Sequence, residues 1–347
     1  MSYNIKLDDI NTSFAMTGYS LGVLGVGTAG KRIIEKISFA LPDAMCISLD
    51  DSEWKVFGGK VREITLSSDI DRSVGNVKRL AWLSSEDIIN SFTEVRNVVV
   101  ISGLGGTVGS SVSPIIAYKL KEAGKKVFGI AIMPFKFEKN RLFKAAVGLR
   151  KLKNSCEGIV IIDNEDFIEK APATPLLKAY ELENDWISKF ISNLFGLKEK
   201  YCLNENEVNE FMHANKNNIL AIGRAEGPIM AEEATLKVSN SIRKQSESAV
   251  KDLLMFVVGW KEISLGDVYT IVSTLKGTTL CEGEVRTGYY LNNGRDITLY
   301  AVASVKSTRF DDWDPISSIL TGRELDLDVC SGMKLIGQEC DSIQRID

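Results

Sequence analysis

Histidine is almost absent from this chain, whose 347 residues contain one, His213. Zinc sites and nucleophile triads rely heavily on imidazole as a metal ligand or a general base. A histidine-based metal site, a Ser–His–Asp triad and a Cys–His dyad would therefore all have to use this one residue. We expect that any catalysis runs instead on carboxylates, amides and backbone dipoles.

The cysteines form no CxxC pair. The six are scattered along the chain at Cys46, Cys156, Cys202, Cys281, Cys330 and Cys340. This spacing is typical of reduced thiols in a large intracellular protein and contains no zinc or redox motif.

Long apolar runs and excess charge are also missing. No run reaches the roughly 18 residues of a membrane span, and the N-terminal MSYNIKLDDINTS is too polar for a signal peptide. Forty-two basic against 46 acidic residues leave a net charge of −4, so nucleic acid and anionic membranes are not expected partners. We expect a cytoplasmic protein without direct membrane insertion, of about two domains by length.

Glycine is concentrated in two stretches of the chain. The first is YSLGVLGVGTAGKRIIEKI. This segment predicts a strand, a GxGxxG turn (Gly25, Gly27, Gly30) and a helix, and DAMCISLDD predicts a second strand. Asp50 lies 20 residues after Gly30, about where a dinucleotide site has its ribose-binding acid. Taken alone, the segment leaves two interpretations open: a nicotinamide-dependent oxidoreductase, or glycines that only close a tight turn.

The second glycine-rich stretch is ISGLGGTVGSSVSP, Ile101 to Pro114. It follows an apolar run and precedes PIIAYKLKEAG, which is typical of a helix. A strand, a glycine turn and a helix start together present backbone N–H groups to an anion, and the helix dipole favours negative charge there. One dinucleotide pyrophosphate needs a single such turn, so two turns indicate a longer phosphate chain. The chain has no GxxxxGK[ST], which excludes a P-loop.

The remaining pattern predicts the fold. Near-continuous apolar runs such as KKVFGIAIMP and EGIVIIDN are typical of parallel strands buried on both faces. TPLLKAYELENDWISKFISNLF has the apolar spacing of a long helix, and MAEEATLKVSNSI predicts another. VYTIVSTL and RDITLYAVASVK alternate as strands of a half-exposed sheet do. We predict an α/β protein with a doubly wound parallel-sheet domain, a long central helix and a smaller α+β second domain.

These segments resemble the tubulin/FtsZ superfamily, particularly its FtsZ-like branch. The family has GGGTG[ST]G followed after two small residues by Pro; here Gly105 to Ser111 occupy those places and Pro114 keeps its position. ILAIGRAEG, Ile219 to Gly227, resembles the MGIGRASG strand that opens the family's second domain. The resemblance spans Tyr19 to Lys306 and implies a tubulin/FtsZ fold. It also implies a divergent protein of archaeal or unusual bacterial origin. It implies GTP or GDP as ligand, with Mg²⁺ bound through the nucleotide and no separate metal site.

The resemblance also assigns roles to residues. PFKFEKNR resembles PFxFEGxxR, so Glu138 and Arg141 would contact ribose and base. IIDNED resembles IPNDR, which makes Asn164 a base or ribose ligand. AYELEN matches AFxxAD, so Tyr180 would stack on guanine and Asn184 would pair with its edge; without the other motifs, a core Tyr180 and a solvated Asn184 is the simpler interpretation. The expected phosphate-binding residues are Gly25, Gly27, Thr28, Gly30, Gly105, Gly106, Thr107, Gly109 and Ser110.

Two departures from the family bear on the phosphate loop. Thr107 stands where the family has its third glycine, and Val108 where it has threonine. A residue other than glycine held at positive φ costs about 1–2 kcal/mol. We therefore expect either a changed loop path or weaker phosphate contacts.

A third departure bears on hydrolysis. In the family, a loop with NxDxxD enters the next subunit's nucleotide site and positions the attacking water. Gap-free alignment back from the AIGR strand places Cys202, Asn204 and Glu207 at these positions. A neutral amide cannot act as a general base, so the candidate catalytic residues are Glu207, the remaining carboxylate, and Asn204. The alternative is that CLNENEVNE is a polar connector in which Glu207 is solvated.

Together these features predict a GTP-binding cytoskeletal protein that assembles head to tail with copies of itself and hydrolyses GTP slowly, as a weak GTPase. Two alternatives stay open: a non-hydrolysing regulator whose partner is another FtsZ-like protein, and the oxidoreductase above. The short, mixed tail does not resemble the family's linker and adaptor-binding peptide, which argues against a classic division ring, while cell division stays among the expected roles. The predicted division of the chain is 15–174 for the GTP-binding domain, 175–197 for the central helix, 198–218 for the connector with the catalytic-type loop, 219–325 for the activation domain and 326–347 for the tail.

Overall fold

The computed structural model describes residues 21–50, 61–66, 73–170, 173–195, 203–246, 248–260, 263–292 and 294–313. Its strands are β1 (Leu21–Val26), β2 (Ala44–Asp50), β3 (Val61–Thr65), β4 (Asn97–Gly103), β5 (Lys126–Met133), β6 (Gly158–Asp163), β7 (Asn217–Glu226), β8 (Val250–Trp260), β9 (Val285–Asn292) and β10 (Asp296–Val305). Its helices are α1 (Gly27–Ala40), α2 (Val74–Leu83), α3 (Ser85–Ser91), α4 (Thr107–Glu122), α5 (Lys139–Ser155), α6 (Glu165–Lys170), α7 (Leu176–Phe195), α8 (Glu205–Ala214), α9 (Met230–Gln245) and α10 (Leu265–Thr278), followed by a short 3-10 helix, Asp311–Trp313.

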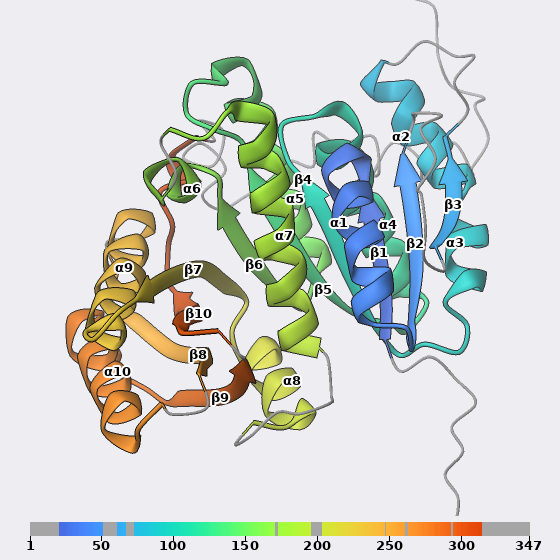
Figure 1. Ribbon diagram of the computed structural model, residues 1–347. Helices are drawn as coiled ribbons and strands as arrows, with labels where there is room; N and C mark the ends of the chain where they lie inside the picture. The colour runs from blue at the N-terminus through green and yellow to red at the C-terminus, as the bar shows by residue number, and fades with distance from the viewer. Residues whose placement is uncertain are drawn as a thin grey trace, which may run out of the picture.

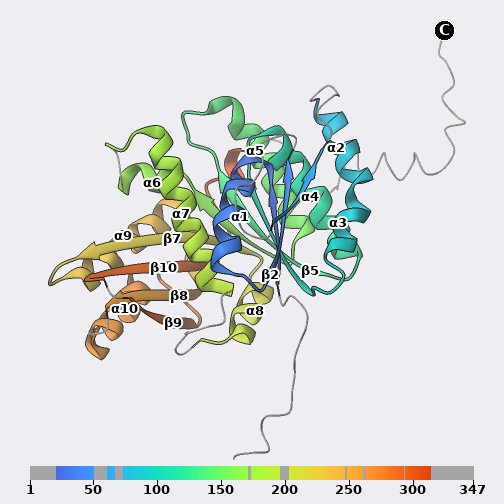
Figure 2. The same cartoon turned by 45° about the vertical axis from the view of Figure 1, so that its right-hand side comes forward.

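These strands form one sheet in the order β3-β2-β1-β4-β5-β6-β7-β10-β8-β9. From β3 to β7 every neighbouring pair is parallel. Strand β10 then runs antiparallel to β7 and β8, and β9 is parallel to β8. Figure 2 shows β7, β10, β8 and β9 in this order beside α7. The predicted fold class, a doubly wound sheet dominated by parallel strands, is confirmed.

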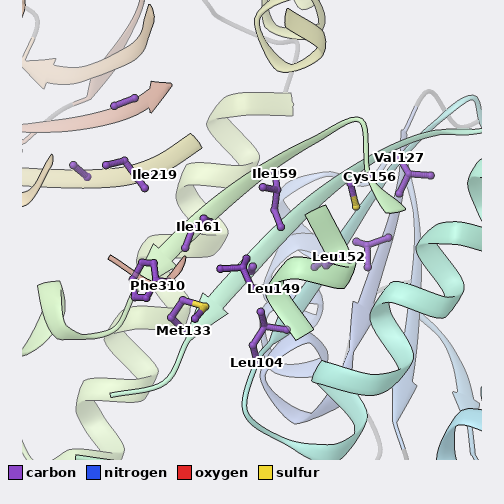
Figure 3. Packing of buried hydrophobic residues seen from close by; sticks show 14 of the residues in the cluster. Leu104, Val127, Met133, Leu149, Leu152, Cys156, Ile159, Ile161, Ile219 and Phe310 are labelled. Carbon is purple, nitrogen blue, oxygen red and sulfur yellow. The ribbon is translucent and has the colours of Figure 1, made fainter. Parts of the chain in front are cut away.

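Helices cover both faces of the sheet (Figure 1). One buried cluster joins apolar residues of α1, α7 and α8 to one face, and another joins those of α2, α4, α5, α9 and α10 to the opposite face. Figure 3 shows part of the second cluster, where Leu149 and Leu152 of α5 pack over Val127 of β5 and over Ile159 and Ile161 of β6. Strands with a helix layer on each side are buried on both faces, which explains their continuous apolar runs.

The structure corrects one predicted strand. VYTIVSTL lies in α10, because Ser264 and Asp267 form a capping box that starts a helix just before it. Buried Ile271 and Leu275 are four residues apart, one helical turn, and face the core. In this short run, β-branched residues produce an alternation that the helix-start signal overrides.

RDITLYAVASVK forms β10 as predicted, but the expected half-exposure is wrong. Residues Leu299 to Val305 are all buried, because β10 lies between β7 and β8 with apolar packing on both of its faces. The predicted domain boundaries stay a prediction; residues 15–20, 196–202 and 326–347 lie outside the described ranges.

The single histidine lies near the end of α8. The His213 Nδ1 is 2.7 Å from a carboxylate oxygen of Glu157, and its Nε2 is 3.1 Å from the Lys126 ammonium. The Phe128 ring meets the imidazole edge to face at 5.3 Å between centroids. These contacts attach α8 to the amino ends of β5 and β6. Within the described ranges no helix combines the length and apolarity that a bilayer crossing demands.

Candidate nucleotide site

The two glycine loops lie side by side at the carboxyl edge of the sheet. Strands β1 and β4 are parallel neighbours, with Val26 opposite Ser102, yet the chain leaves β1 toward β2 and β4 toward β5. This is the switch point of a doubly wound sheet, where ligands bind at the carboxyl ends of the strands. Each loop leads directly into a helix N-terminus, α1 after the first and α4 after the second.

The first loop is closed by backbone contacts that only glycine allows. A Cβ on Gly25 would lie 2.5 Å from the Gly30 carbonyl oxygen, and one on Gly30 would lie 2.5 Å from that of Ile101. Gly27 adopts φ +72° and approaches the other loop, since a Cβ there would lie 3.3 Å from the Gly109 nitrogen. Thr28 is exposed at the start of α1, 3.5 Å from the buried Asp50 carboxylate.

The second loop is equally tight. Gly109 approaches the Gly103 carbonyl so closely that an added Cβ would lie 2.0 Å from its oxygen. Gly105 has φ +96° and packs against Arg141 of α5. The Ser110 hydroxyl accepts a 2.7 Å hydrogen bond from the Gly105 N–H, so Ser110 shapes the turn as well as facing it. Gly106 is exposed at the N-cap of α4.

The expected strain at Thr107 is absent. Leu280 is the one described residue other than glycine with positive φ, and Thr107 is the first residue of α4, with Gly106 extended before it. Because Gly105 carries the left-handed conformation, the loop takes a path in which threonine fits without strain. Of the two expected outcomes, the structure favours a changed path.

At the other end of this edge, the loop after β5 meets the start of α7. Arg141 and Glu138 form a 2.8 Å ion pair, and the second Glu138 oxygen accepts from the Phe135 N–H at 3.1 Å. The Phe135 ring meets Tyr180 edge to face at 5.5 Å between centroids. Burial raises the pKa of the half-buried Tyr180, and the charges of Glu138 and Glu183 raise it further. The structure thus brings Glu138, Arg141 and Tyr180 together.

Both predicted asparagines are buried. Asn164, directly after β6, is 6% exposed and its Oδ1 has no hydrogen-bond partner among the described residues. Asn184 is 8% exposed, which excludes the alternative of a solvated helix face. A buried amide without a partner carries a free-energy penalty of about 1–3 kcal/mol. Such groups are explained when a ligand supplies the missing hydrogen bonds.

Acidic residues that the motifs did not single out surround this end. Asp163, at the end of β6, is paired with Arg309 and accepts from the Glu165 N–H. Burial, the largest cause, raises the pKa of Asp163 to about 6 although Arg309 opposes the shift. Glu183 of α7 is 3% exposed; burial and then the charges of Asp163 and Glu138 raise its pKa to about 8. The sequence carried one signal for Glu183, an acid where the AFxxAD motif has alanine.

Asn204 and Glu207 lie elsewhere, at the start of α8, at the end of the molecule away from the glycine loops (Figure 1). They form a capping box: Asn204 Oδ1 accepts from the Glu207 N–H at 3.0 Å, and Glu207 Oε2 accepts from the Asn204 N–H at 2.7 Å. The polar connector is therefore a capped helix from Glu205 onward. Cys202 lies outside the described residues.

Comparison with known proteins agrees with this geometry, which is characteristic of α/β proteins that bind phosphates at a switch point. The family described as "Tubulin/FtsZ family, GTPase domain" matches residues 70–172. The cell division protein FtsZ of Mycoplasmopsis pulmonis is 26% identical over 263 residues, which are 72% of this chain and 67% of that protein.

Solved structures show the same fold. An FtsZ dimer from M. jannaschii, in its empty form, has a TM-score of 0.73 at 20% identity and covers 84% of this chain and 89% of its own. CetZ2 from Haloferax volcanii, a GTPγS-bound protofilament, has a TM-score of 0.71 at 15% identity and covers 87% of this chain and 98% of its own.

These matches support a divergent, FtsZ-like member of the tubulin/FtsZ superfamily, with the family's GTPase domain matched over residues 70–172. They likewise support a GTP-binding protein of the cytoskeletal class.

Proposed function

We propose that the chain binds GTP across the carboxyl edge of the sheet and assembles head to tail into protofilaments. The observation that carries this proposal is the placement of two glycine loops at the β1–β4 switch point, with two buried asparagines farther along the same edge, one of which, Asn164, has an unpartnered amide oxygen. Helix N-termini behind both loops favour negative charge, and the buried amides suit a flat, hydrogen-bonding base.

The roles follow from position. Gly25, Gly27, Thr28 and Gly30 would hold phosphates from one side, and Gly105, Gly106, Thr107, Gly109 and Ser110 from the other. Tyr180 would stack on the base, Asn164 and Asn184 would hydrogen-bond it, and Glu138 and Arg141 would hold ribose and base. Mg²⁺ would bind through the phosphates of the nucleotide.

Apolar side chains exposed at two ends of the molecule support assembly. Phe137 and Leu177 are exposed beside the nucleotide edge, and Leu265 and Tyr269 are exposed on α10. Figure 1 places α8 and α10 at the lower end of the view and the carboxyl edge at the upper end. Exposed apolar residues at opposite ends suit a heterologous contact, which repeats into a filament when it does not close. The solved relatives include a protofilament.

The first test is right-angle light scattering after adding GTP and Mg²⁺, with GDP as control. We expect a rise with GTP alone. Tyr269→Glu should abolish the rise while leaving GTP affinity unchanged, whereas Leu236→Glu, on the exposed face of α9, serves as the matched control. Equal scattering by Tyr269→Glu and wild type would contradict the end-to-end contact.

Hydrolysis would be slow and would depend on Glu207 from the next subunit. Its carboxylate has a capping role as well, so alanine would remove both functions at once. Glu207→Gln separates them, because glutamine keeps a capping box but cannot act as a general base. We expect assembly with GTP but phosphate release at least tenfold slower, while Glu210→Ala on the same helix hydrolyses at the wild-type rate. Unchanged phosphate release in Glu207→Gln would exclude a catalytic role.

A second candidate is a non-hydrolysing regulator of another FtsZ-like protein. One observation favours it: the two candidate catalytic side chains hydrogen-bond each other's backbone at the cap of α8. GTP binding by calorimetry together with a flat scattering trace would support the regulator over the filament.

A further inference from the structure

The motif that positions the base differs from its family pattern at two adjacent places. Where the pattern AFxxAD has Ala and then Asp, this chain has Glu183 and then Asn184. The carboxyl group has thus moved back by one residue along α7, and an amide stands in its former place. On a helix, Glu183 and Asn184 both lie next to Tyr180, at spacings of three and four residues.

Glu183 is buried without the partners that a buried acid normally has. It is 3% exposed, and among the described residues it has no hydrogen bond or ion pair. The nearby cations are engaged elsewhere, since Arg309 pairs with Asp163 and Arg141 pairs with Glu138. Leaving a buried carboxyl unpaired is costly even when it is neutral. An apolar side chain at this place would stabilise the fold more.

The surroundings of Glu183 belong to the proposed base site. The groups whose charges act on it are Asp163, which precedes Asn164, and Glu138, which pairs with Arg141. Its own charge acts in turn on the Tyr180 hydroxyl. Its raised pKa, about 8 from burial first and these acids second, leaves the carboxyl largely protonated at neutral pH. In that state it offers one acceptor and one donor to a ligand.

The edge of guanine shows what such a group can bind. That edge presents one acceptor, O6, and two donors, N1–H and the 2-amino group. The Asn184 amide can satisfy O6 with its N–H and N1–H with its oxygen. The 2-amino group carries two N–H donors, so beside the free Oδ1 of Asn164 it can use a second acceptor. The carbonyl oxygen of the Glu183 carboxyl is the acceptor that α7 supplies.

We propose that Glu183 accepts a hydrogen bond from the 2-amino group of the bound purine and sets the preference for guanine over hypoxanthine. This inference rests on the proposed function, because it requires that the base lies between Tyr180 and Asn184. It makes Glu183 a specificity-determining residue at a place where the motif has none.

Calorimetric titration with GTP and with ITP, which lacks only the 2-amino group, tests the inference. Wild type should bind GTP at least tenfold more tightly than ITP, since one hydrogen bond of about 1.4 kcal/mol gives a factor of ten. In Glu183→Ala the GTP affinity should fall about tenfold with ITP unchanged, so the ratio falls by the same factor. Glu183→Gln keeps a carbonyl acceptor and should retain the ratio. The exposed neighbour Glu181→Ala is the control.

Three results would overturn the inference. A wild-type GTP to ITP ratio near one does so without any variant. Equal loss of both nucleotides in Glu183→Ala would make the residue structural, and an unchanged ratio there would remove it from the site. Failure of wild type to bind either nucleotide would instead refute the proposed function itself.

Discussion

At the phosphate end of the proposed site the working groups are backbone atoms, whereas at the base end they are side chains. At the phosphate end Gly25, Gly30 and Gly109 pack against carbonyl oxygens, with gaps too small for a methyl group. The base end is made of buried amides and acids brought from β6 and α7, among them Asn164, whose Oδ1 has no partner. Substitutions in the first region should lower stability through steric clashes, and substitutions in the second should lower it through unbalanced charge. Substitutions in the two regions can separate these two modes.

The largest effect should come from the charged region. Arg309→Met leaves Asp163 buried without its partner, which costs about 3–5 kcal/mol of unfolding free energy. Losing the cation raises the pKa of Asp163 above its present value of about 6. Burial and the charge of Asp166 then raise the pKa, and only the hydrogen bond from the Glu165 N–H still lowers it. The loss should therefore be large at pH 8 and shrink at pH 5, where the acid is protonated. Urea unfolding at both pH values measures it.

Arg286→Met is the control, because its pair with the exposed Glu284 is expected to contribute less than about 1 kcal/mol. A loss in Arg309→Met that does not depend on pH would show that packing rather than charge dominates there, and the comparison of the two regions would break down.

The steric region should respond next. Gly109→Ala places a Cβ 2.0 Å from the Gly103 carbonyl oxygen, so backbone must move. We expect a loss of about 3 kcal/mol at every pH, as for severe overpacking. Gly106→Ala, in the same loop with φ −82° and no atom within 4 Å of the new Cβ, should change stability little. Equal thermal shifts in the two variants would show that the loop adapts to added volume.

A gain in stability is expected at Glu183. Burial raises its pKa from 4.5 to about 8, so the native state binds a proton that the unfolded state has released. Stability therefore falls as pH rises from 4.5 toward 8. Glu183→Gln removes this proton uptake and should be more stable than wild type by more than about 1 kcal/mol at pH 8, but not at pH 4. Parallel pH profiles for the two proteins would mean that Glu183 is not buried in neutral form.

The smallest change in stability is expected for Arg141→Ala. Arg141 is largely exposed and its pair with Glu138 lies near the surface, so the loss should stay below about 1 kcal/mol. GTP affinity should nevertheless fall, since Arg141 is placed at the base end. Lys139→Ala, exposed in the same turn of α5, should leave the affinity unchanged. A fall in both variants would indicate general attraction of the anion by charge.

The sequence predicted the parts of this molecule that depend on local pattern. The strand–glycine–helix units around Gly25 and Gly105 were predictable because tight turns need glycine and buried parallel strands need continuous apolar runs. The α10 helix was not predictable from VYTIVSTL, because alternation over these eight residues also fits a helix whose capping residues lie outside the run. Strand β10 is buried because it lies between two neighbouring strands. This position depends on the strand order, which the local sequence pattern does not contain.

The site divides in the same way. Tyr180, Glu138 and Arg141 were named through motifs and lie together. The pairing of Asp163 with Arg309 joins residues 146 positions apart, and no spacing rule connects them. The burial of Glu183 follows from how α7 packs on the sheet, so the motif marked its unusual identity but could not show its neutral state.

The single histidine has a practical consequence. His213 lies near the end of α8, the helix that begins at Asn204 and Glu207, and is fixed there by Glu157, Lys126 and the edge of Phe128. Because the chain holds no second imidazole, its ring protons give one isolated set of NMR signals that needs no assignment. A change in those signals on assembly would report directly on α8, so the molecule carries its own spectroscopic probe at the end where the next subunit's nucleotide is expected to dock.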